Sequence, residues 1–85
     1  MKSIVSVNPQ KFEIKETDFQ GDHYIFLKYY TSDLGYFCSC KFTDMLYDTI
    51  SDALACGSSE PIKIAIDFRY NRFKHAYTIS NMDLA

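Results

Sequence analysis

The chain has 85 residues, of which 47% are hydrophobic and 16% aromatic, with seven tyrosines and seven phenylalanines but no tryptophan. This length predicts a single domain over residues 1–85, and the aromatic content predicts a dense core built mainly from strands. Nine basic residues against eleven acidic ones give a formal net charge of −2, which excludes a histone-like polycation.

The first half of the chain predicts strands, because apolar residues alternate with polar ones in short runs. In the second of these runs, Phe12 and Ile14 point to one face and their charged neighbours to the other. The strand-like runs cover residues 3–7, 11–19, 23–30 and 36–42, with turns predicted at residues 20–22 and 32–35. We therefore expect three antiparallel strands with a short extra strand leading into them.

Residues 43–57 change to a helical period. Thr43 suits the N-cap of this helix, and Gly57 suits the position just beyond its last turn. Two rows recur at four-residue spacing, offset by about 200° around the axis: the apolar Leu46, Ile50 and Leu54, and the acidic Asp44, Asp48 and Asp52. The pattern predicts an amphipathic helix with one face in the core and an acidic face in water.

The last part of the chain predicts a β-hairpin, with strands over residues 62–70 and 73–80 and a turn at residues 71–72. Residues 61–85 carry four bases against two acids, so this end of the chain is locally basic. Alternation predicts Phe68, His75 and Tyr77 on the core side, Arg69 and Lys74 on the outer side, and Tyr70 and Phe73 beside the tip.

The resulting order, β-β-β-α-β-β, is typical of the OB-fold, a small antiparallel barrel whose lower end the helix would close. In length and element order over residues 11–84, the chain resembles small phage- and plasmid-type OB-fold proteins that bind single-stranded DNA. Three stretches carry the resemblance: YIFLKYY at residues 24–30, SDLG at 32–35 and FRYNRFKHAY at 68–77. The resemblance implies binding of single-stranded DNA or RNA in a surface groove, a role in DNA replication, a homodimer and no cofactor.

Such binding combines cations that follow the phosphates with aromatic rings on which bases stack. The predicted nucleic-acid-binding residues are Arg69, Tyr70, Arg72, Lys74, Tyr30, Lys28 and Lys41. Tyr30 is chosen because it and Tyr29 point to opposite faces of one strand, so that at least one of them is exposed. The alternative interpretation of the cations is a solvated polar face that keeps the hairpin soluble.

A second function is a small phage or mobile-element protein that binds and inhibits a host protein. Here the regularly spaced Asp44, Asp48 and Asp52 would imitate phosphates, whereas their ordinary interpretation is a solvated helix face. A third possibility is a structural subunit that uses its aromatic residues only for assembly.

Catalytic and metal-binding motifs are absent from the sequence. It contains no phosphate-binding loop, nucleophile elbow or metalloprotease motif, so we expect no enzyme activity and no catalytic residues. Cys38, Cys40 and Cys56 lack the paired spacing of a zinc site, so we expect small buried thiols and no metal.

The N-terminus has no signal-peptide pattern, and no apolar run approaches transmembrane length. An odd number of cysteines, two of them neighbours on one expected strand, argues against a disulfide framework. The sequence therefore predicts a soluble cytoplasmic protein without a membrane partner.

Overall fold

The computed structural model describes residues 1–32 and 35–85. These residues form a mainly β structure with one α-helix, as the sequence predicts. The elements are β1 (Lys2–Val7), the 3-10 helix η1 (Pro9–Lys11), β2 (Phe12–Phe19), β3 (Asp22–Thr31), β4 (Gly35–Ser39), α1 (Asp44–Cys56), β5 (Ile62–Asn71) and β6 (Ala76–Leu84).

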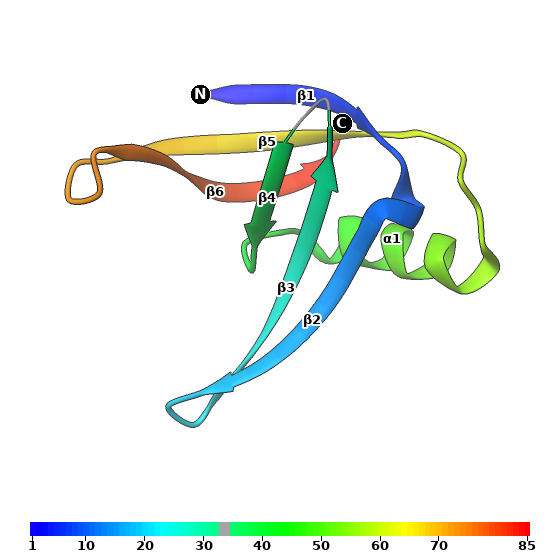
Figure 1. Cartoon of the computed structure of the whole chain (residues 1–85), viewed down its shortest axis with the longest axis horizontal. Coiled ribbons are helices and arrows are strands. Elements are labelled where there is room, and N and C mark those ends of the chain that lie inside the picture. Colours follow the sequence, from blue (N-terminus) through cyan, green and yellow to red (C-terminus); the bar gives the residue numbers. More distant parts are fainter. Residues whose placement is uncertain (33–34) are drawn as a thin grey trace.

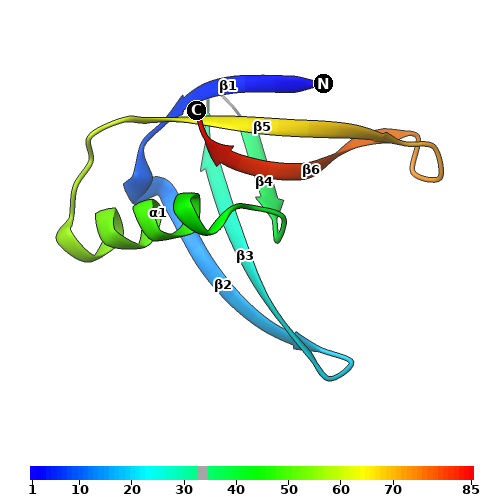
Figure 2. The same ribbon diagram turned by 180° about the vertical axis from the view of Figure 1, so that it is seen from behind.

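The strands form two antiparallel three-stranded sheets, shown in Figures 1 and 2. Sheet A has the order β1-β5-β6, and sheet B has the order β2-β3-β4. In Figure 1 the strands of sheet A run across the view while those of sheet B run steeply down it. Because β1 leads through η1 directly into β2, this N-terminal segment supplies one strand to each sheet.

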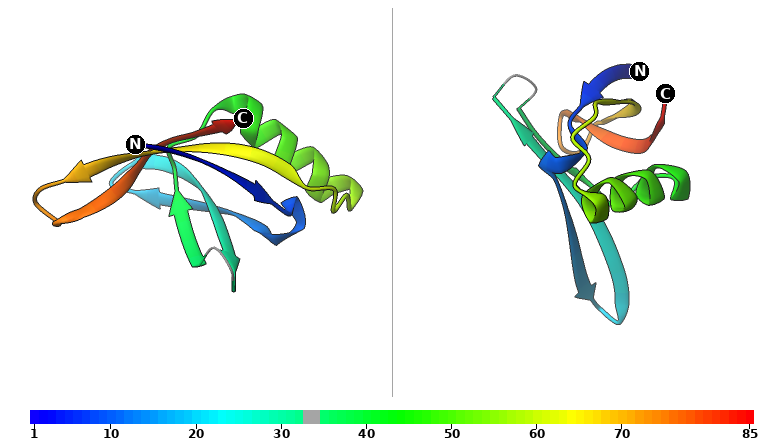
Figure 3. Two further views of the ribbon diagram at one scale, coloured as in Figure 1. Left: turned by 90° about the horizontal axis from the view of Figure 1, so that it is seen from above. Right: turned by 90° about the vertical axis from the view of Figure 1, so that its right-hand side faces the viewer.

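The hydrophobic core lies where the two sheets and α1 meet. Strand alternation turns one face of each sheet inward, and the helix adds its apolar row. The buried residues that form this cluster are Val7, Phe12, Leu27, Tyr29, Leu46, Ile50, Ile64, Ile66 and Met82. Seen from the side in Figure 3, the β2–β3 hairpin extends well beyond this region.

The helix begins and ends where the sequence predicts. The Thr43 hydroxyl accepts a hydrogen bond from the Leu46 N–H, and Gly57 closes the helix in the left-handed region at φ 74°. Leu46, in the first turn, is fully buried. At the other end, the Gln10 amide donates to the carbonyl of Ala53 at 2.7 Å and to that of Ser58 at 2.6 Å. The helix C-terminus is thereby attached to η1.

In the described residues the two sheets are not closed into a barrel, because no β-ladder joins sheet A to sheet B. In the connection between β4 and α1, Thr43 forms hydrogen bonds to β6. The Thr43 N–H donates to the Met82 carbonyl at 2.9 Å, and the Thr43 hydroxyl donates to Asp83 Oδ1 at 2.7 Å. These bonds bring the connection after β4 to β6, whereas the described parts of β4 and β6 do not pair with each other.

The last hairpin differs from its prediction. Residues 72–75 form the turn, and β6 starts three residues later than expected. His75 has a left-handed φ of 51° and is exposed, and Tyr77 is also exposed, so their expected place in the core is wrong. The physical reason is length: β5 and β6 run past the opposing elements, so alternation continues where nothing covers the inner face.

Two further boundaries differ from the sequence prediction. Strand β4 ends at Ser39, so Lys41 lies in the connection to α1 rather than in a strand, and its N–H donates to the Ser39 hydroxyl at 2.9 Å. The turn predicted at residues 32–35 includes Asp33 and Leu34, which lie outside the described residues.

Candidate nucleic-acid interface

Sheet B has a core face and an outer face, and adjacent residues on β3 show the division. Tyr29 is 3% exposed, whereas Tyr30 is 67% exposed on the opposite side. Tyr30 pairs with Tyr36 on β4, and Lys28 pairs with Cys38, so these side chains share the outer face. The outer face of sheet B carries Glu13, Lys15, Thr17, Phe19, Asp22, Tyr24, Phe26, Lys28, Tyr30, Tyr36 and Cys38, and Glu13 is the direct partner of Lys28 across the sheet.

Three shallow hollows adjoin one another across this outer face. The first, of about 360 Å³, is apolar and is lined by Thr17, Phe19, Tyr24, Phe26 and Cys40. The second, of about 220 Å³, is lined by Lys15, Thr17, Phe26, Lys28, Tyr36 and Cys38. The third, of about 120 Å³, is lined by Lys11, Glu13, Lys28, Tyr29, Tyr30 and Tyr36. Because each hollow shares two residues with the next, they form one continuous track.

Among the described residues, no cation of this track forms an ion pair within 4.0 Å, although Glu13 lies opposite Lys28 across the sheet. In residues 1–32 and 35–85, the ion pairs within 4.0 Å are those that join His23 to Glu16 and Asp18. The ammonium of Lys28 lies 5.9 Å from the ring centroid of Tyr36, within the range of a cation–π contact. The track therefore offers an ammonium group beside an exposed aromatic ring.

A second basic and aromatic cluster lies on the end of the β5–β6 hairpin, here called the arm (residues 68–79). The rings of Tyr70 and Tyr77 meet edge to face at 5.4 Å between centroids. Asn71 Oδ1 closes the turn by accepting from the N–H groups of Phe73 at 3.0 Å and Lys74 at 3.2 Å. A hollow of about 230 Å³ here is lined by Arg69, Tyr70, Asn71, Arg72, Phe73 and Thr78.

The structure divides the predicted binding residues between these two clusters. Lys28 and Tyr30 lie on the track, whereas Arg69, Tyr70 and Arg72 line the hollow of the arm. None of these hollows is lined by residues of both clusters. Figure 1 shows the arm extending to the left while the β2–β3 hairpin extends downward. Lys74 lies in the turn of the arm, and Lys41 is exposed after β4, outside both hollows.

Sequence reasoning missed Phe19 and Phe26, which line the apolar hollow. Phe26 is half-buried and faces outward, since its partner across the sheet is Lys15. The signal was present in the alternation of β3: counting back from Tyr30 by twos reaches Lys28, Phe26 and then Tyr24.

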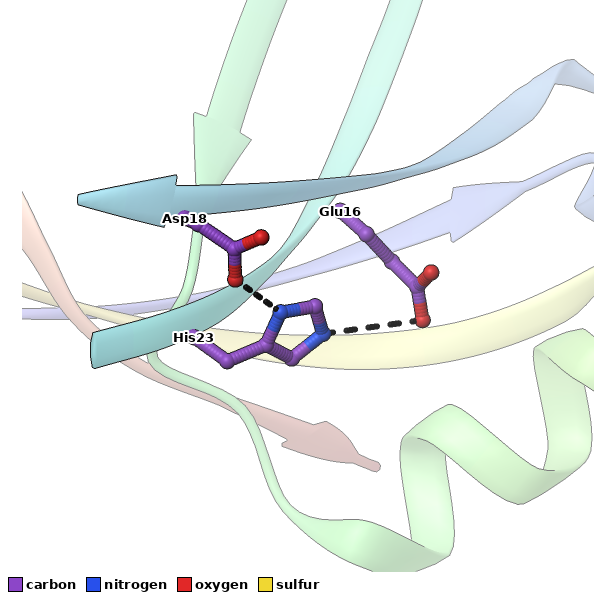
Figure 4. A network of polar contacts seen from close by, with 3 residues as sticks. All are labelled: Glu16, Asp18 and His23. Atoms are coloured by element: carbon purple, nitrogen blue, oxygen red, sulfur yellow. Dashed lines mark hydrogen bonds and ion pairs between the residues drawn. The ribbon is translucent and has the colours of Figure 1, made fainter. Parts of the chain in front are cut away.

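The tip of the β2–β3 hairpin carries a different polar group, drawn in Figure 4. His23 lies between two carboxylates, with its Nδ1 2.8 Å from Asp18 Oδ1 and its Nε2 3.8 Å from Glu16 Oε1. The hydrogen bond to Asp18, assisted by the negative charge of both acids, raises the pKa of His23 above its ordinary value. These carboxylates would repel a phosphate, and they lie on the face of the hairpin opposite the track, so this polar group is not part of the candidate interface.

The thiols are more exposed than the sequence predicts. All three cysteines are free; Cys38 and Cys56 are exposed and Cys40 is half-buried, so the expected burial is wrong for the first two. Within the described ranges, no group of three or more histidine, cysteine or acidic side chains is placed to hold a metal ion.

The acidic row of α1 faces solvent. Asp44, Asp48 and Asp52 are all exposed, on the side of the helix opposite the fully buried Leu46 and Ile50. In the part of the chain that the structure describes, no helix has the length and apolar character needed to span a membrane.

Comparisons of the chain with protein-family models, with curated proteins and with solved structures find no match. We therefore infer function from the surface of this chain alone.

Proposed function

We propose that this protein binds single-stranded nucleic acid, DNA in the first instance, along the outer face of sheet B and catalyses no reaction. The continuous track carries the proposal. Tyr30 and Tyr36 are 67% and 59% exposed on neighbouring strands, and Lys28 lies beside them. Exposed rings next to a cation suit bases that stack while their phosphates are neutralised.

The support behind the track favours the same function. On the core face, the ring of Tyr29 packs against Phe12 at 4.7 Å and against Phe37 at 5.2 Å between centroids. Stacking contributes about 1–3 kcal/mol per base. The stacking free energy of two or three bases can therefore outweigh the repulsion that a net charge of −2 exerts on the phosphates. With few cations on the track, we expect a moderate dependence of affinity on salt.

We further propose an OB-type barrel as the scaffold. The split segment β1–β2 pairs with both β5 and β3, as the long first strand of an OB-fold pairs with two neighbours, and only pairing between β4 and β6 is lacking. In an OB-fold the face of strands two and three, here β3 and β4, binds oligonucleotides. The homodimer and the phage-type role in replication, expected from the resemblance, and the cytoplasmic location, expected from the cysteines and the N-terminus, belong to this proposal.

The test is a titration of fluorescently labelled oligo-dT at several salt concentrations. We expect micromolar or tighter binding that weakens with salt and that falls about tenfold or more in Tyr30→Ala/Tyr36→Ala, because stacking is lost. Lys28→Ala should also weaken binding, whereas the matched control Lys63→Ala, which changes an exposed lysine of sheet A, should not. Absence of binding at low salt by the folded wild type would refute the proposal.

A second candidate function is inhibition of a host protein, and the exposed acidic row supports it. Successive aspartates of the row lie about 6 Å apart along the helix axis, so their carboxylates could imitate a line of phosphates. Asp48→Lys separates the two functions: it should leave oligo-dT binding intact if the track is the site, and should abolish capture of the host protein if the row is the site.

A further inference from the structure

No residue of the arm lines the three hollows of the single-strand track. The strands of the arm pair from Phe68↔Ile79 to Asn71↔Ala76, while the neighbouring β1 begins its own pairing with β5 at Asp67. Met1 still contacts the first residue of the arm, since its ammonium donates to the Phe68 carbonyl at 3.0 Å and its carbonyl accepts from the Phe68 N–H at 2.6 Å. From Arg69 onward the arm is a two-stranded ribbon, and no third strand of the described residues pairs with it. Tyr70 and Tyr77 are both exposed on it and contact each other.

The charge of the arm suits a polyanion. Residues 68–82 hold three cations, Arg69, Arg72 and Lys74, and no carboxylate. In residues 1–32 and 35–85, none of these cations forms an ion pair within 4.0 Å. A chain whose net charge is −2 thus concentrates unpaired positive charge on one projecting element, which favours contact with phosphates.

The shape of the arm suits a duplex better than a single strand. A two-stranded β-ribbon fits the major groove of double-stranded DNA, whose two phosphate chains border the groove on both sides. At the tip, Phe73 is 91% exposed and contributes nothing to the core. A ring presented in this way can stack on, or wedge into, the end of a base-paired stack.

We propose that the arm binds double-stranded nucleic acid next to the single strand held by the track, so that the preferred ligand is a junction between single- and double-stranded segments. The inference rests on the proposed function, because the track must hold the unpaired part. Duplex alone is bound weakly, because the three cations of the arm are then the main contacts to its phosphates and the track holds no single strand. Attachment of the single strand raises the effective concentration of the duplex at the arm, and we expect roughly tenfold tighter binding of the junction.

The experiment compares three labelled probes by fluorescence anisotropy: an oligo-dT of about eight nucleotides, which suits one binding face, a blunt DNA hairpin, and the same hairpin with that dT tail. Wild type should bind the tailed hairpin roughly tenfold more tightly than the oligo-dT. Arg69→Ala/Arg72→Ala should remove this difference and leave oligo-dT binding unchanged. For this variant on the tailed hairpin, the slope of log binding constant against log salt concentration should become shallower by about 0.9 for each lost phosphate contact.

Phe73→Ala is a second test, because the exposed ring makes no contribution to folding. We expect it to weaken binding of the tailed hairpin but not of the oligo-dT, whereas Lys63→Ala should change neither. Circular dichroism verifies that each variant is folded.

The outcomes separate the two proposals. Equal affinity of wild type for oligo-dT and tailed hairpin overturns the inference and leaves the proposed function standing. If Arg69→Ala/Arg72→Ala loses affinity for the oligo-dT and the tailed hairpin equally, the inference is also overturned, because the arm would then belong to the single-strand track. Absence of binding to all three probes refutes both proposals.

Discussion

The outer face of sheet B and the arm both expose aromatic rings beside cations, yet they differ in what lies behind them. Behind the outer face, Tyr29 packs between Phe12 and Phe37 in the core. On the arm, Tyr70 and Tyr77 are more than half exposed, and each has the other as its aromatic partner. Aromatic residues and cations thus lie on a face backed by the core in sheet B, and on a projecting two-stranded ribbon in the arm.

The tips of the two long hairpins also differ in charge. The β2–β3 tip holds His23 between Glu16 and Asp18, whereas the arm has cations and no carboxylate between residues 68 and 82. Both hairpins project from the core in Figure 2, but the turn of β2–β3 has two residues, Gln20 and Gly21, whereas the turn of the arm has four, residues 72–75. Of the two tips, the side-chain charge favours phosphate contacts at the tip of the arm.

The largest expected effect compares two adjacent tyrosines. Tyr29→Ala should reduce the free energy of unfolding by about 3–5 kcal/mol, because it leaves a cavity behind the platform. It also removes the hydroxyl that accepts the Asn8 N–H at 3.2 Å. Tyr30→Ala should change stability by less than about 0.5 kcal/mol, because its ring is exposed. Urea denaturation measures both changes. Equal destabilisation by the two variants would show that the Tyr30 ring is packed against another part of the protein.

Thr43 tests the link between the segment that follows sheet B and strand β6 of sheet A. Thr43→Ala should destabilise the protein by about 0.5–2 kcal/mol, since it removes the N-cap of α1 and the hydrogen bond to Asp83. Thr43→Ser keeps the hydroxyl and serves as the control in the same denaturation experiment. A serine variant as unstable as the alanine variant would assign the effect to the lost methyl group instead.

On the arm, the expected energies are smaller. A double-mutant cycle on Tyr70→Ala and Tyr77→Ala should give a coupling free energy of about 0.5–1.5 kcal/mol, from their edge-to-face contact. Thermal or urea denaturation of the four proteins measures it. A coupling of zero would mean that the rings do not hold the ribbon together.

The smallest effect is the pH response of the β2–β3 tip. Because folding raises the pKa of His23 above its ordinary value of 6.5, its contribution to stability is complete below that pH and is lost as pH rises through the folded pKa. NMR titration should show the raised pKa in wild type and a lower one in Asp18→Asn. The same pKa in both proteins would contradict the role of the Asp18 carboxylate.

Local chemistry made much of the fold predictable. The helix could be placed from Thr43 and Gly57, because capping depends on neighbouring residues only. Alternation likewise placed Phe12 inward, and the exposure of Tyr30 opposite the buried Tyr29 confirms that the two point to opposite faces.

What could not be predicted depends on contacts between distant segments. Alternation continues through Tyr70 and Tyr77 even though no opposing element covers them, so periodicity alone could not tell core from arm. The division of the binding residues into track and arm depends on the orientation of two sheets, which no local pattern encodes. Likewise, whether β4 and β6 pair depends on tertiary packing.

The N-terminal segment that serves both sheets also bears on the order of folding. Strands β2, β3 and β4 follow one another closely, so sheet B can form from local contacts. In contrast, β1 pairs Lys2 with Asp67 and must wait for β5, which closes a long loop at an entropic cost. We therefore expect the addition of β1 to the local β5–β6 hairpin to be the slower step. Until then β1 remains an unpaired apolar strand, the segment of this chain most open to misassociation.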